Sequence, residues 1–322
     1  MLYDMGAAEL KGYASAQHDP SDFDAFWSET ISDARTHPLD LRLEEVASPL
    51  ETIRVYDLGF RGYGGELIRA WLRLPAAAPD HGAAVVQFHG YARGRGEPTE
   101  NLLWASAGFV HVEVDTRGQG WGTTRGSTPD LAARSGSTPG FVTLGIRERD
   151  TYYYRRLFTD AVRAVEAARS LANVDAARLG LYGLSQGGAT ALASAALAPS
   201  VQALVARVPF LSDISRAVRI TDAAPYSELA GYFAHYRHEA ARIESDVLPY
   251  FDGVNFARRA SPAALFVAAL MDRVCPPSTV YAAFNAYRGP KQLVAREFNG
   301  HEAGGVDDEL LAIEHFRTHL LG

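Results

Sequence analysis

The spacing of hydrophobic positions changes along the chain, and it predicts a series of strands and helices. Residues 52–58 alternate as an edge strand does, and with a second strand at 67–74 across turn residues 59–65 they predict an antiparallel hairpin. Residues 83–88 form a continuous apolar run, typical of a strand buried on both faces. Further strands are predicted at residues 109–115, 178–183, 204–208, 264–270 and 292–298.

Helices are predicted between these strands. Apolar residues recur at helical spacing over residues 159–171, and a helix rich in small residues is expected at 187–197. Another helix is expected to start within residues 22–27, with Ser21 as its cap. Two more helices are predicted, at residues 102–105 and 307–321.

This order of elements predicts an α/β fold. Strands that alternate with helices favour a mostly parallel central sheet flanked by helices, and the hairpin adds an N-terminal antiparallel extension. Residues 211–256 interrupt the alternation with a mostly helical, polar and aromatic pattern. We expect this segment to be an insertion that covers the sheet edge within a single domain of residues 1–322.

Composition and charge exclude several classes of protein. The chain has 31 Lys and Arg against 38 Asp and Glu, a net charge of −7, so it lacks the basic footprint of a nucleic-acid-binding protein. It contains no apolar stretch of about 18 residues, so no membrane span is expected. The N-terminus lacks the basic start and apolar run of a signal peptide, and we expect a cytoplasmic protein. With one cysteine, Cys275, the chain cannot form an intrachain disulfide.

The strongest candidate for chemistry is the segment Gly-Leu-Ser-Gln-Gly at residues 183–187. It lies between a predicted strand and a predicted helix, which is the context that the G-x-S-x-G motif requires. The serine of this motif occupies a tight, strained turn that exposes its hydroxyl above the sheet, and the glycines avoid clashes there. The motif therefore predicts an α/β-hydrolase fold with Ser185 as the nucleophile.

A serine nucleophile needs a histidine base, which in this fold comes last along the chain. His301 follows the last predicted strand, where a short loop can bring it over the sheet, and we predict that it is the base. The other histidines after the serine lie in the insertion (His235, His238) or in the final helix (His315, His319).

The acid that orients the histidine is expected between the two in sequence. Asp272 follows the strand at 264–270, and a carboxylate at the carboxyl end of a parallel strand faces the same rim as Ser185. Aspartates of the insertion lack this placement, so we predict that Asp272 is the third member of the triad.

The tetrahedral intermediate needs two N–H donors for its oxyanion. One is expected from the backbone of Gln186, directly after the nucleophile, and the other from the loop after an earlier strand. Tyr91, in the sequence His89-Gly90-Tyr91, is the candidate, and its ring could also line the acyl pocket and bind substrate. His89 precedes the nucleophile, so we interpret it as structural.

Three further features bear on the site. Residues 117–119 (Arg-Gly-Gln) are either a brace for the active-site loops or a solvated turn, and spacing alone does not decide between them. The aromatic and basic residues 152–156 favour a helix face packed on the sheet or on another subunit. Cys275 lies near Asp272 with no histidine or acid placed in the sequence to activate it. We find no metal-ligand cluster, phosphate loop or dinucleotide fingerprint, and expect no cofactor.

Together these segments resemble carbohydrate esterase family seven, the acetyl xylan esterases and cephalosporin C deacetylases. The resemblance covers nearly the whole chain and is specific because the motifs occur together and in order. The matching segments are 22–27 (DFDAFW), 89–91 (HGY), 117–119 (RGQ), 152–166 (YYYRRLFTDAVRAVE), 183–188 (GLSQGG), 209–211 (PFL), 250–257 (YFDGVNFA), 271–272 (MD), 275–279 (CPPST) and 301–302 (HE).

The resemblance implies a function and an assembly. It implies a triad of Ser185, Asp272 and His301, with oxyanion donors on Tyr91 and Gln186. It also implies removal of acetyl groups from small acetylated sugars, short xylo-oligosaccharides and cephalosporin C, without a cofactor. Proteins of this family resemble ring-shaped, cytoplasmic hexamers built as trimers of dimers.

The chain departs from the family pattern in two places, and both bear on substrate preference and assembly. Leu144 stands where the family tends to carry arginine, and residues 120–124 (GWGTT) differ from the small, serine-rich run expected there. Other functions compatible with the sequence are a broader short-chain carboxylesterase, a peptidase related to the prolyl peptidases, and a hydrolase-fold protein that only binds ligands. The peptidase reading is disfavoured because that family usually adds a propeller domain, for which this chain has no room.

Overall fold

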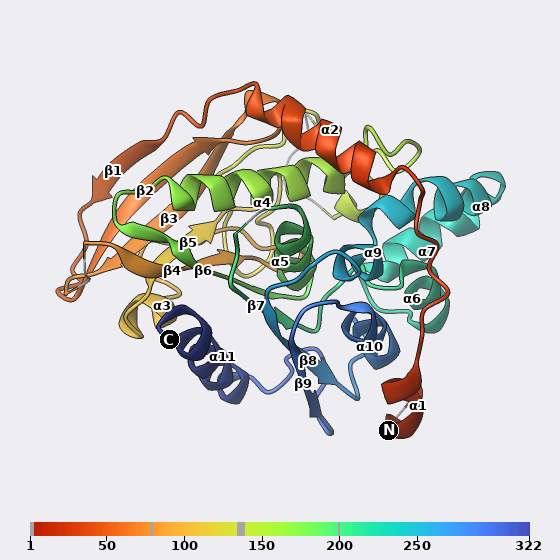
Figure 1. Ribbon diagram of the computed structural model, residues 1–322. Helices are drawn as coiled ribbons and strands as arrows, with labels where there is room; N and C mark the ends of the chain where they lie inside the picture. The colour runs from red at the N-terminus through yellow and green to blue at the C-terminus, as the bar shows by residue number, and fades with distance from the viewer. Residues whose placement is uncertain (1–2, 78–79, 134–138, 199) are drawn as a thin grey trace.

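The computed structural model describes residues 3–77, 80–133, 139–198 and 200–322, and a nine-stranded sheet runs through them (Figure 1). The strand order is β1-β2-β3-β5-β4-β6-β7-β8-β9. The strands are β1 (Arg42–Val46), β2 (Ile53–Arg61), β3 (Leu67–Pro75), β4 (Gly82–Phe88), β5 (Val110–Val114), β6 (Val174–Leu184), β7 (Ala203–Arg207), β8 (Ala263–Ala269) and β9 (Lys291–Arg296).

The sheet is antiparallel at its N-terminal end and parallel elsewhere. Strands β1, β2 and β3 pair antiparallel, β3 joins β5 antiparallel, and every pair from β5 to β9 is parallel. The predicted hairpin and mixed α/β sheet are therefore confirmed. The predicted edge position of residues 52–58 is wrong, because β1 covers β2 on its outer side. The sequence of β1, RLEEV, is largely exposed and lacks the apolar alternation by which a strand is recognised.

Helices cover both faces of the sheet. α4 and α5 pack on one face, joined by α2 and α9, while α3 and α11 lie on the other (Figure 1). The helices are α1 (Ala7–Gly12), α2 (Phe23–Arg35), α3 (Leu103–Ser106), α4 (Tyr153–Arg169), α5 (Gln186–Leu197), α6 (Ile214–Ile220), α7 (Tyr226–His235), α8 (Arg237–Asp246), α9 (Gly253–Ala257), α10 (Pro277–Ala286) and α11 (Val306–Leu320), with short 3-10 turns η1 (Tyr63–Gly65), η2 (Phe141–Thr143) and η3 (Leu248–Phe251).

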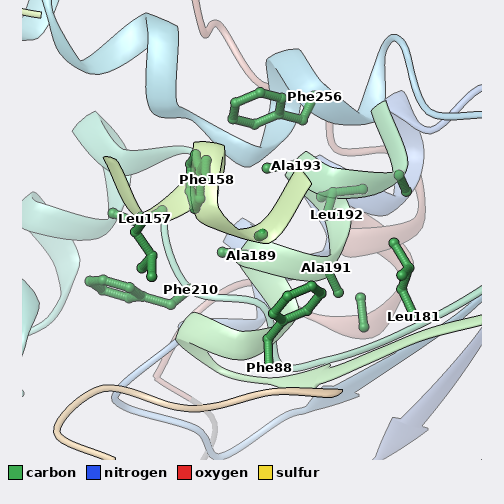
Figure 2. Packing of buried hydrophobic residues seen from close by; sticks show 14 of the residues in the cluster. Phe88, Leu157, Phe158, Leu181, Ala189, Ala191, Leu192, Ala193, Phe210 and Phe256 are labelled. Atoms are coloured by element: carbon green, nitrogen blue, oxygen red, sulfur yellow. The ribbon is translucent and has the colours of Figure 1, made fainter. Parts of the chain in front are cut away.

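The core on the α4 and α5 side combines large and small residues. Figure 2 shows Phe256 of α9 above the small side chains of α5, Phe158 of α4 and Leu181 of the sheet on either side of them, and Phe88 of the sheet below. All of these residues are buried. The small residues of α5 let this helix approach the sheet closely, which determines where its N-terminus and the preceding serine lie.

Two local predictions need correction. The N-cap of α2 is Asp22, not Ser21, and no side-chain capping bond is made there. Helix α4 begins at Tyr153, six residues before the predicted helix 159–171, so the aromatic residues 152–154 begin this helix and are buried. Among the described residues, no helix has the length and apolar character needed to cross a membrane.

The predicted insertion is helical, but it does not cover a sheet edge. It comprises α6, α7, α8, η3 and α9, and joins β7 to β8, which are interior strands. Helix α6 packs on α7 and α10, and α7 packs on η2. Glu228 of α7 accepts a hydrogen bond from Tyr91, which follows β4. The insertion therefore lies beside loops that follow the carboxyl ends of central strands.

Candidate active site

Ser185 occupies a strained turn between β6 and α5. Its backbone has φ 59° and ψ −121°, a conformation that non-glycine residues rarely adopt. The flanking glycines are required by close packing, since a Cβ on Gly183 would lie 2.0 Å from the Gly187 oxygen, and one on Gly187 would lie 2.2 Å from the Phe88 oxygen. The Ser185 N–H donates to the Arg207 carbonyl at 2.9 Å. The expected strand–turn–helix context of the motif is therefore present.

Asp272 and His301 meet at the carboxyl end of the sheet. Asp272 follows β8 and is fully buried, and its Oδ2 lies 2.8 Å from Nδ1 of His301, whose side chain is 29% exposed. The other carboxylate oxygen of Asp272 accepts the N–H groups of Val274 at 2.7 Å and Cys275 at 3.0 Å. These two bonds orient the carboxylate so that Oδ2 is left for the histidine.

The Cys275 thiol lies beside this pair. It is fully buried, and burial raises its pKa well above the ordinary range, while the Ser185 side chain acts in the opposite direction. Its sulfur and donor atoms of Asp272 and His301 lie within 4.8 Å of one another. The structure therefore brings Asp272, His301 and the neutral Cys275 thiol together, and the influence of Ser185 on that thiol places the serine side chain next to this group. The expectation that no histidine or acid is placed beside Cys275 is therefore wrong, because the fold brings in His301 from a later loop, but burial keeps the thiol protonated.

Asp272, Cys275 and His301 form the one group among the described residues that is chemically suited to hold a metal ion. Two ligands on one tetrahedral zinc ion lie about 3.3 Å apart, given metal–ligand distances near 2.0 Å. The 2.8 Å separation of Asp272 Oδ2 and His301 Nδ1 is shorter than that and fits a hydrogen bond. The arrangement is that of an acid and the imidazole it orients.

The loop that carries His301 is attached to β7 by Arg207, a buried residue that the sequence analysis did not identify. Its guanidinium donates to the carbonyls of Glu302 at 3.4 Å and Gly305 at 3.2 Å, while its own carbonyl accepts the Ser185 N–H. Asp308, also buried, accepts the Gly304 N–H at 2.6 Å. One residue thus links the serine turn to the histidine loop, and no local motif marks it because its partners are distant in sequence.

Gln119 decides the question left open for residues 117–119. Its Oε1 accepts the Ala92 N–H at 2.7 Å, and its Nε2 donates to Gln186 Oε1 at 2.9 Å and to the Tyr153 hydroxyl at 3.0 Å. The Tyr154 hydroxyl donates to the same Gln186 oxygen at 3.1 Å. Gln119 and Gln186 are both buried. The segment is therefore a brace that ties the loop after β4 to the residue after the serine.

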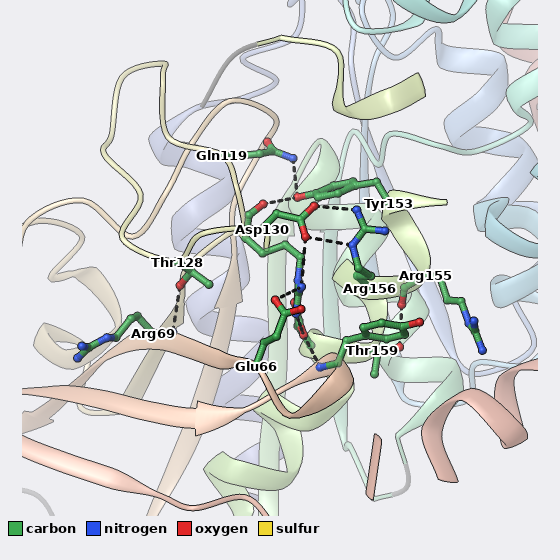
Figure 3. Close-up of polar contacts among 12 residues, drawn as sticks. Glu66, Arg69, Gln119, Thr128, Asp130, Tyr153, Arg155, Arg156 and Thr159 are labelled. Carbon is green, nitrogen blue, oxygen red and sulfur yellow. Dashed lines mark hydrogen bonds and ion pairs between the residues drawn. The ribbon is translucent and has the colours of Figure 1, made fainter. Parts of the chain in front are cut away.

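Arg117 anchors this brace within a buried ionic cluster. Its guanidinium contacts Asp160 at 2.5 and 2.9 Å, Glu66 at 2.8 Å and Asp130 at 3.4 Å. Arg156 donates to Asp130 at 2.7 Å, and Figure 3 shows this contact beside Glu66 and the Gln119–Tyr153 bond. Residues 152–156 are therefore structural, as expected. Buried charges persist only when paired in this way, so the cluster holds the start of α4 and residues 117–119 together.

The Tyr91 side chain is held by contacts to its hydroxyl and to its ring. Its hydroxyl donates to Glu228 at 2.9 Å and accepts the N–H groups of Gly140 at 3.1 Å and Phe141 at 3.0 Å. Its ring meets the Trp121 ring edge to face, with centroids 5.3 Å apart. The departure from the family pattern at residues 120–124 therefore lies directly against this loop, and its Gly122 N–H donates to the Ala92 carbonyl at 2.8 Å.

The other departure lies one step further away. Leu144 packs against the core, and its carbonyl accepts the Tyr153 N–H at 2.9 Å. Tyr153 links it to the site, because the Tyr153 hydroxyl accepts a hydrogen bond from Gln119.

His89 is placed for a structural role. It is buried, and burial lowers its pKa to about 3, so the imidazole is neutral. Its Nε2 lies 3.3 Å from the Glu113 carboxylate, outside hydrogen-bond geometry. Its carbonyl accepts from the Gln186 amide at 3.4 Å. Glu113 is in turn held by Arg73 at 2.6 Å, so His89 lies against a closed ion pair within the sheet.

Comparison with known proteins places this geometry in a family. Residues 1–317 match the model of the acetyl xylan esterase (AXE1) family. The chain is similar to the solved acetyl xylan esterase from Paenibacillus sp. R4, at 35% identity and a TM-score of 0.91, covering 98% of this chain and 100% of that one. It is also similar to acetyl xylan esterase 1 from Thermoanaerobacterium sp. JW/SL YS485, at 33% identity and a TM-score of 0.88, covering 98% of each chain.

More distant similarities extend the comparison. Over 296 residues, 91% of this chain, it is 28% identical to acetyl esterase Axe7A of Xylanibacter ruminicola, and it spans 65% of the length of that relative. The acylaminoacyl peptidase of Pyrococcus horikoshii is 16% identical with a TM-score of 0.60, covering 84% of this chain and 42% of that one. At that identity the likeness concerns the fold alone.

Proposed function

The chain belongs to the acetyl xylan esterase family, and on this premise we propose that it is a serine esterase that removes O-acetyl groups from small acetylated sugars, xylo-oligosaccharides and cephalosporin C. The observation that carries the proposal is the 2.8 Å contact between Asp272 and His301 beside the strained serine turn. Acyl transfer requires an imidazole that is oriented by a buried carboxylate and lies near a serine on a strained turn of this kind.

The proposed reaction proceeds through an acyl-enzyme. Nδ1–H of His301 donates to Asp272, so Nε2 is free to take the Ser185 proton as the hydroxyl oxygen attacks the acetyl carbonyl. The backbone N–H groups of Tyr91 and Gln186 stabilise the oxyanion. His301 returns the proton to the departing sugar oxygen, leaving acetyl on Ser185. Water, activated by the same histidine, then releases acetate and restores the serine.

The proposed substrate class rests on the relatives, and one local feature bears on it. Trp121 lies against the Tyr91 ring in the segment that departs from the family pattern. A bulky ring at this place favours a changed alcohol or acyl preference, which makes a broader short-chain carboxylesterase the second candidate. The Tyr91 ring is proposed to bind substrate as a wall of the acyl pocket.

A hexamer built as a trimer of dimers and a cytoplasmic location are proposals carried by the family resemblance.

The test is hydrolysis of p-nitrophenyl acetate, butyrate and octanoate by the wild type and by Ser185→Ala, followed by acetylated xylose and cephalosporin C. We expect a steep preference for acetate, loss of turnover in Ser185→Ala, and fluorophosphonate labelling at Ser185 in the wild type alone. Turnover by a folded Ser185→Ala variant would overturn the nucleophile. A preference for octanoate would overturn the deacetylase, and absent labelling of the wild type would favour a protein that only binds ligands.

A further inference from the structure

The helical insertion contributes one residue to the loop that carries the proposed oxyanion donor. We propose that Glu228 of α7 is a positioning residue, which holds the Tyr91 side chain so that the Tyr91 N–H points at the oxyanion. This inference rests on the proposed function, because it takes the Tyr91 N–H as a donor in catalysis. Glu228 touches neither Ser185 nor His301 in the contacts described above, so its effect acts through Tyr91.

The hydrogen bonds of the Tyr91 hydroxyl are the first support. A phenol has one donor and two acceptor positions, and here all are used, by Glu228 and by the N–H groups of Gly140 and Phe141. The two N–H groups occupy the acceptor positions, so the hydroxyl proton has to go to Glu228. The ring is thereby fixed in position and in rotation about its hydroxyl end.

The backbone around Tyr91 explains why this anchor matters. The following peptide is already held, because Gln119 accepts the Ala92 N–H and Gly122 donates to the Ala92 carbonyl. The Tyr91 N–H belongs to the preceding peptide, whose Gly90 carbonyl accepts the Arg93 N–H at 3.2 Å. The Tyr91 side chain adds a constraint on the residue that carries this N–H, and an oxyanion donor is effective only when it is preorganised.

The placement of Glu228 gives the insertion a role in catalysis. Its carboxylate joins α7 to the loop after β4, and the other partners of the hydroxyl come from residues 140–141. A shift of α7, for example on substrate binding, would therefore be transmitted to the oxyanion donor.

The test compares kcat and KM of Glu228→Ala, Glu228→Gln, Tyr91→Phe and the double variant Glu228→Ala/Tyr91→Phe on p-nitrophenyl acetate. A lost oxyanion donor costs about 10²–10³ in kcat, so we expect a misplaced one to cost roughly 10-fold, with KM changed by less than about 2-fold. Glu228→Gln keeps an acceptor for the phenol and should retain most of the wild-type kcat. The double variant should be no slower than either single variant, because both remove one interaction.

The insertion offers a matched control. Tyr232 donates to Glu239 at 3.0 Å, which is the same tyrosine–carboxylate chemistry on neighbouring helices without contact to the Tyr91 loop. Glu239→Ala should leave kcat unchanged, and fluorophosphonate end-point labelling with melting temperatures corrects each variant for its folded fraction. Wild-type kcat in folded Glu228→Ala, or multiplicative losses in the double variant, would overturn the inference. If Glu228→Ala does not fold, a kcat of Tyr91→Phe equal to that of the wild type overturns the inference instead. Failure of the proposed function is separate, since it appears as absent Ser185 labelling in the wild type.

Discussion

The loop that carries His301 and the loop that carries Tyr91 both follow strands of the sheet at their carboxyl ends, yet they are held by different kinds of contact. The histidine loop is tied by charged residues to its backbone, with Arg207 donating to two carbonyls and Asp308 accepting an N–H. The Tyr91 loop is tied mainly by amide and phenol groups, chiefly Gln119 and the Tyr91 hydroxyl, and Glu228 is the one carboxylate that bonds this hydroxyl.

The difference matches what each side of the site has to do. His301 is 29% exposed and in the proposed reaction accepts and returns a proton, so it needs room for small movements and access to water. The proposed oxyanion donors act as fixed dipoles, whose value comes from being in place before charge develops. Gln119 and Gln186 are accordingly buried in a network with few ways to rearrange. We therefore expect substitutions on the two sides to differ in how they change kcat and stability.

The largest effect is expected on the histidine side. Asp272→Asn leaves the shape of the site but replaces the acceptor that sets the His301 tautomer, so kcat should fall by about 10⁴-fold. KM and the melting temperature should change little, and kinetics on p-nitrophenyl acetate with thermal melts measure both. Asp246→Asn, on the surface of α8, serves as the control and should be indistinguishable from the wild type. A loss in kcat below 10-fold would contradict the role of Asp272.

A smaller but broader effect is expected on the oxyanion side. Gln119→Leu leaves the Ala92 N–H without its partner and removes one hydrogen bond from the Gln186 amide, which keeps the Tyr154 hydroxyl and the His89 carbonyl. The unsatisfied N–H costs about 1–3 kcal/mol of stability. The substitution should also lower kcat by roughly 10–100-fold, since a donor is displaced and not removed. Unfolding in urea and steady-state kinetics measure the two effects.

Gln202→Leu is the matched control for this variant. Gln202 also accepts a backbone N–H, that of Leu179 at 2.9 Å, in the loop before β7 and away from the serine turn. It should lose stability without losing kcat. Equal losses of kcat in the two variants would mean that Gln119 acts only on the fold.

The smallest effect concerns pH and the histidine loop. Hydrogen bonds from its own backbone, from the Asn299 amide and from the Gly300 N–H lower the pKa of Glu302 below its ordinary value of 4.5. A carboxyl group with a lowered folded pKa contributes stability that is complete above pH 4.5 and is lost as the pH falls through the lowered value. Glu302→Gln should therefore lower the melting temperature by roughly 1 °C at pH 7, and the difference should vanish in acid. A constant difference across melts from pH 7 to pH 3 would contradict this.

Several features could be predicted because they depend on neighbours in sequence. The serine turn at residues 183–187 follows from two glycines between a strand and a helix, and the parallel strands follow from continuous apolar runs such as residues 83–88. Asp272 and His301 were found because a parallel sheet brings the carboxyl ends of its strands to one rim, so their strands predicted where they lie. Strand β1 was missed because an exposed strand with polar residues carries no apolar period.

What the sequence by itself determined is the α/β class, the serine turn and the two residues that meet beside it, since strand order along the chain and local spacing are enough for these. The contacts of Gln119, Arg207, Cys275 and Glu228, and the position of the insertion beside the strand ends, were decided only by the tertiary structure. Each of these residues acts through partners far away in the chain, such as Gln119 with Ala92 and Gln186, or Glu228 with Tyr91. Such contacts arise from packing of whole elements, and no pattern of neighbouring residues encodes them.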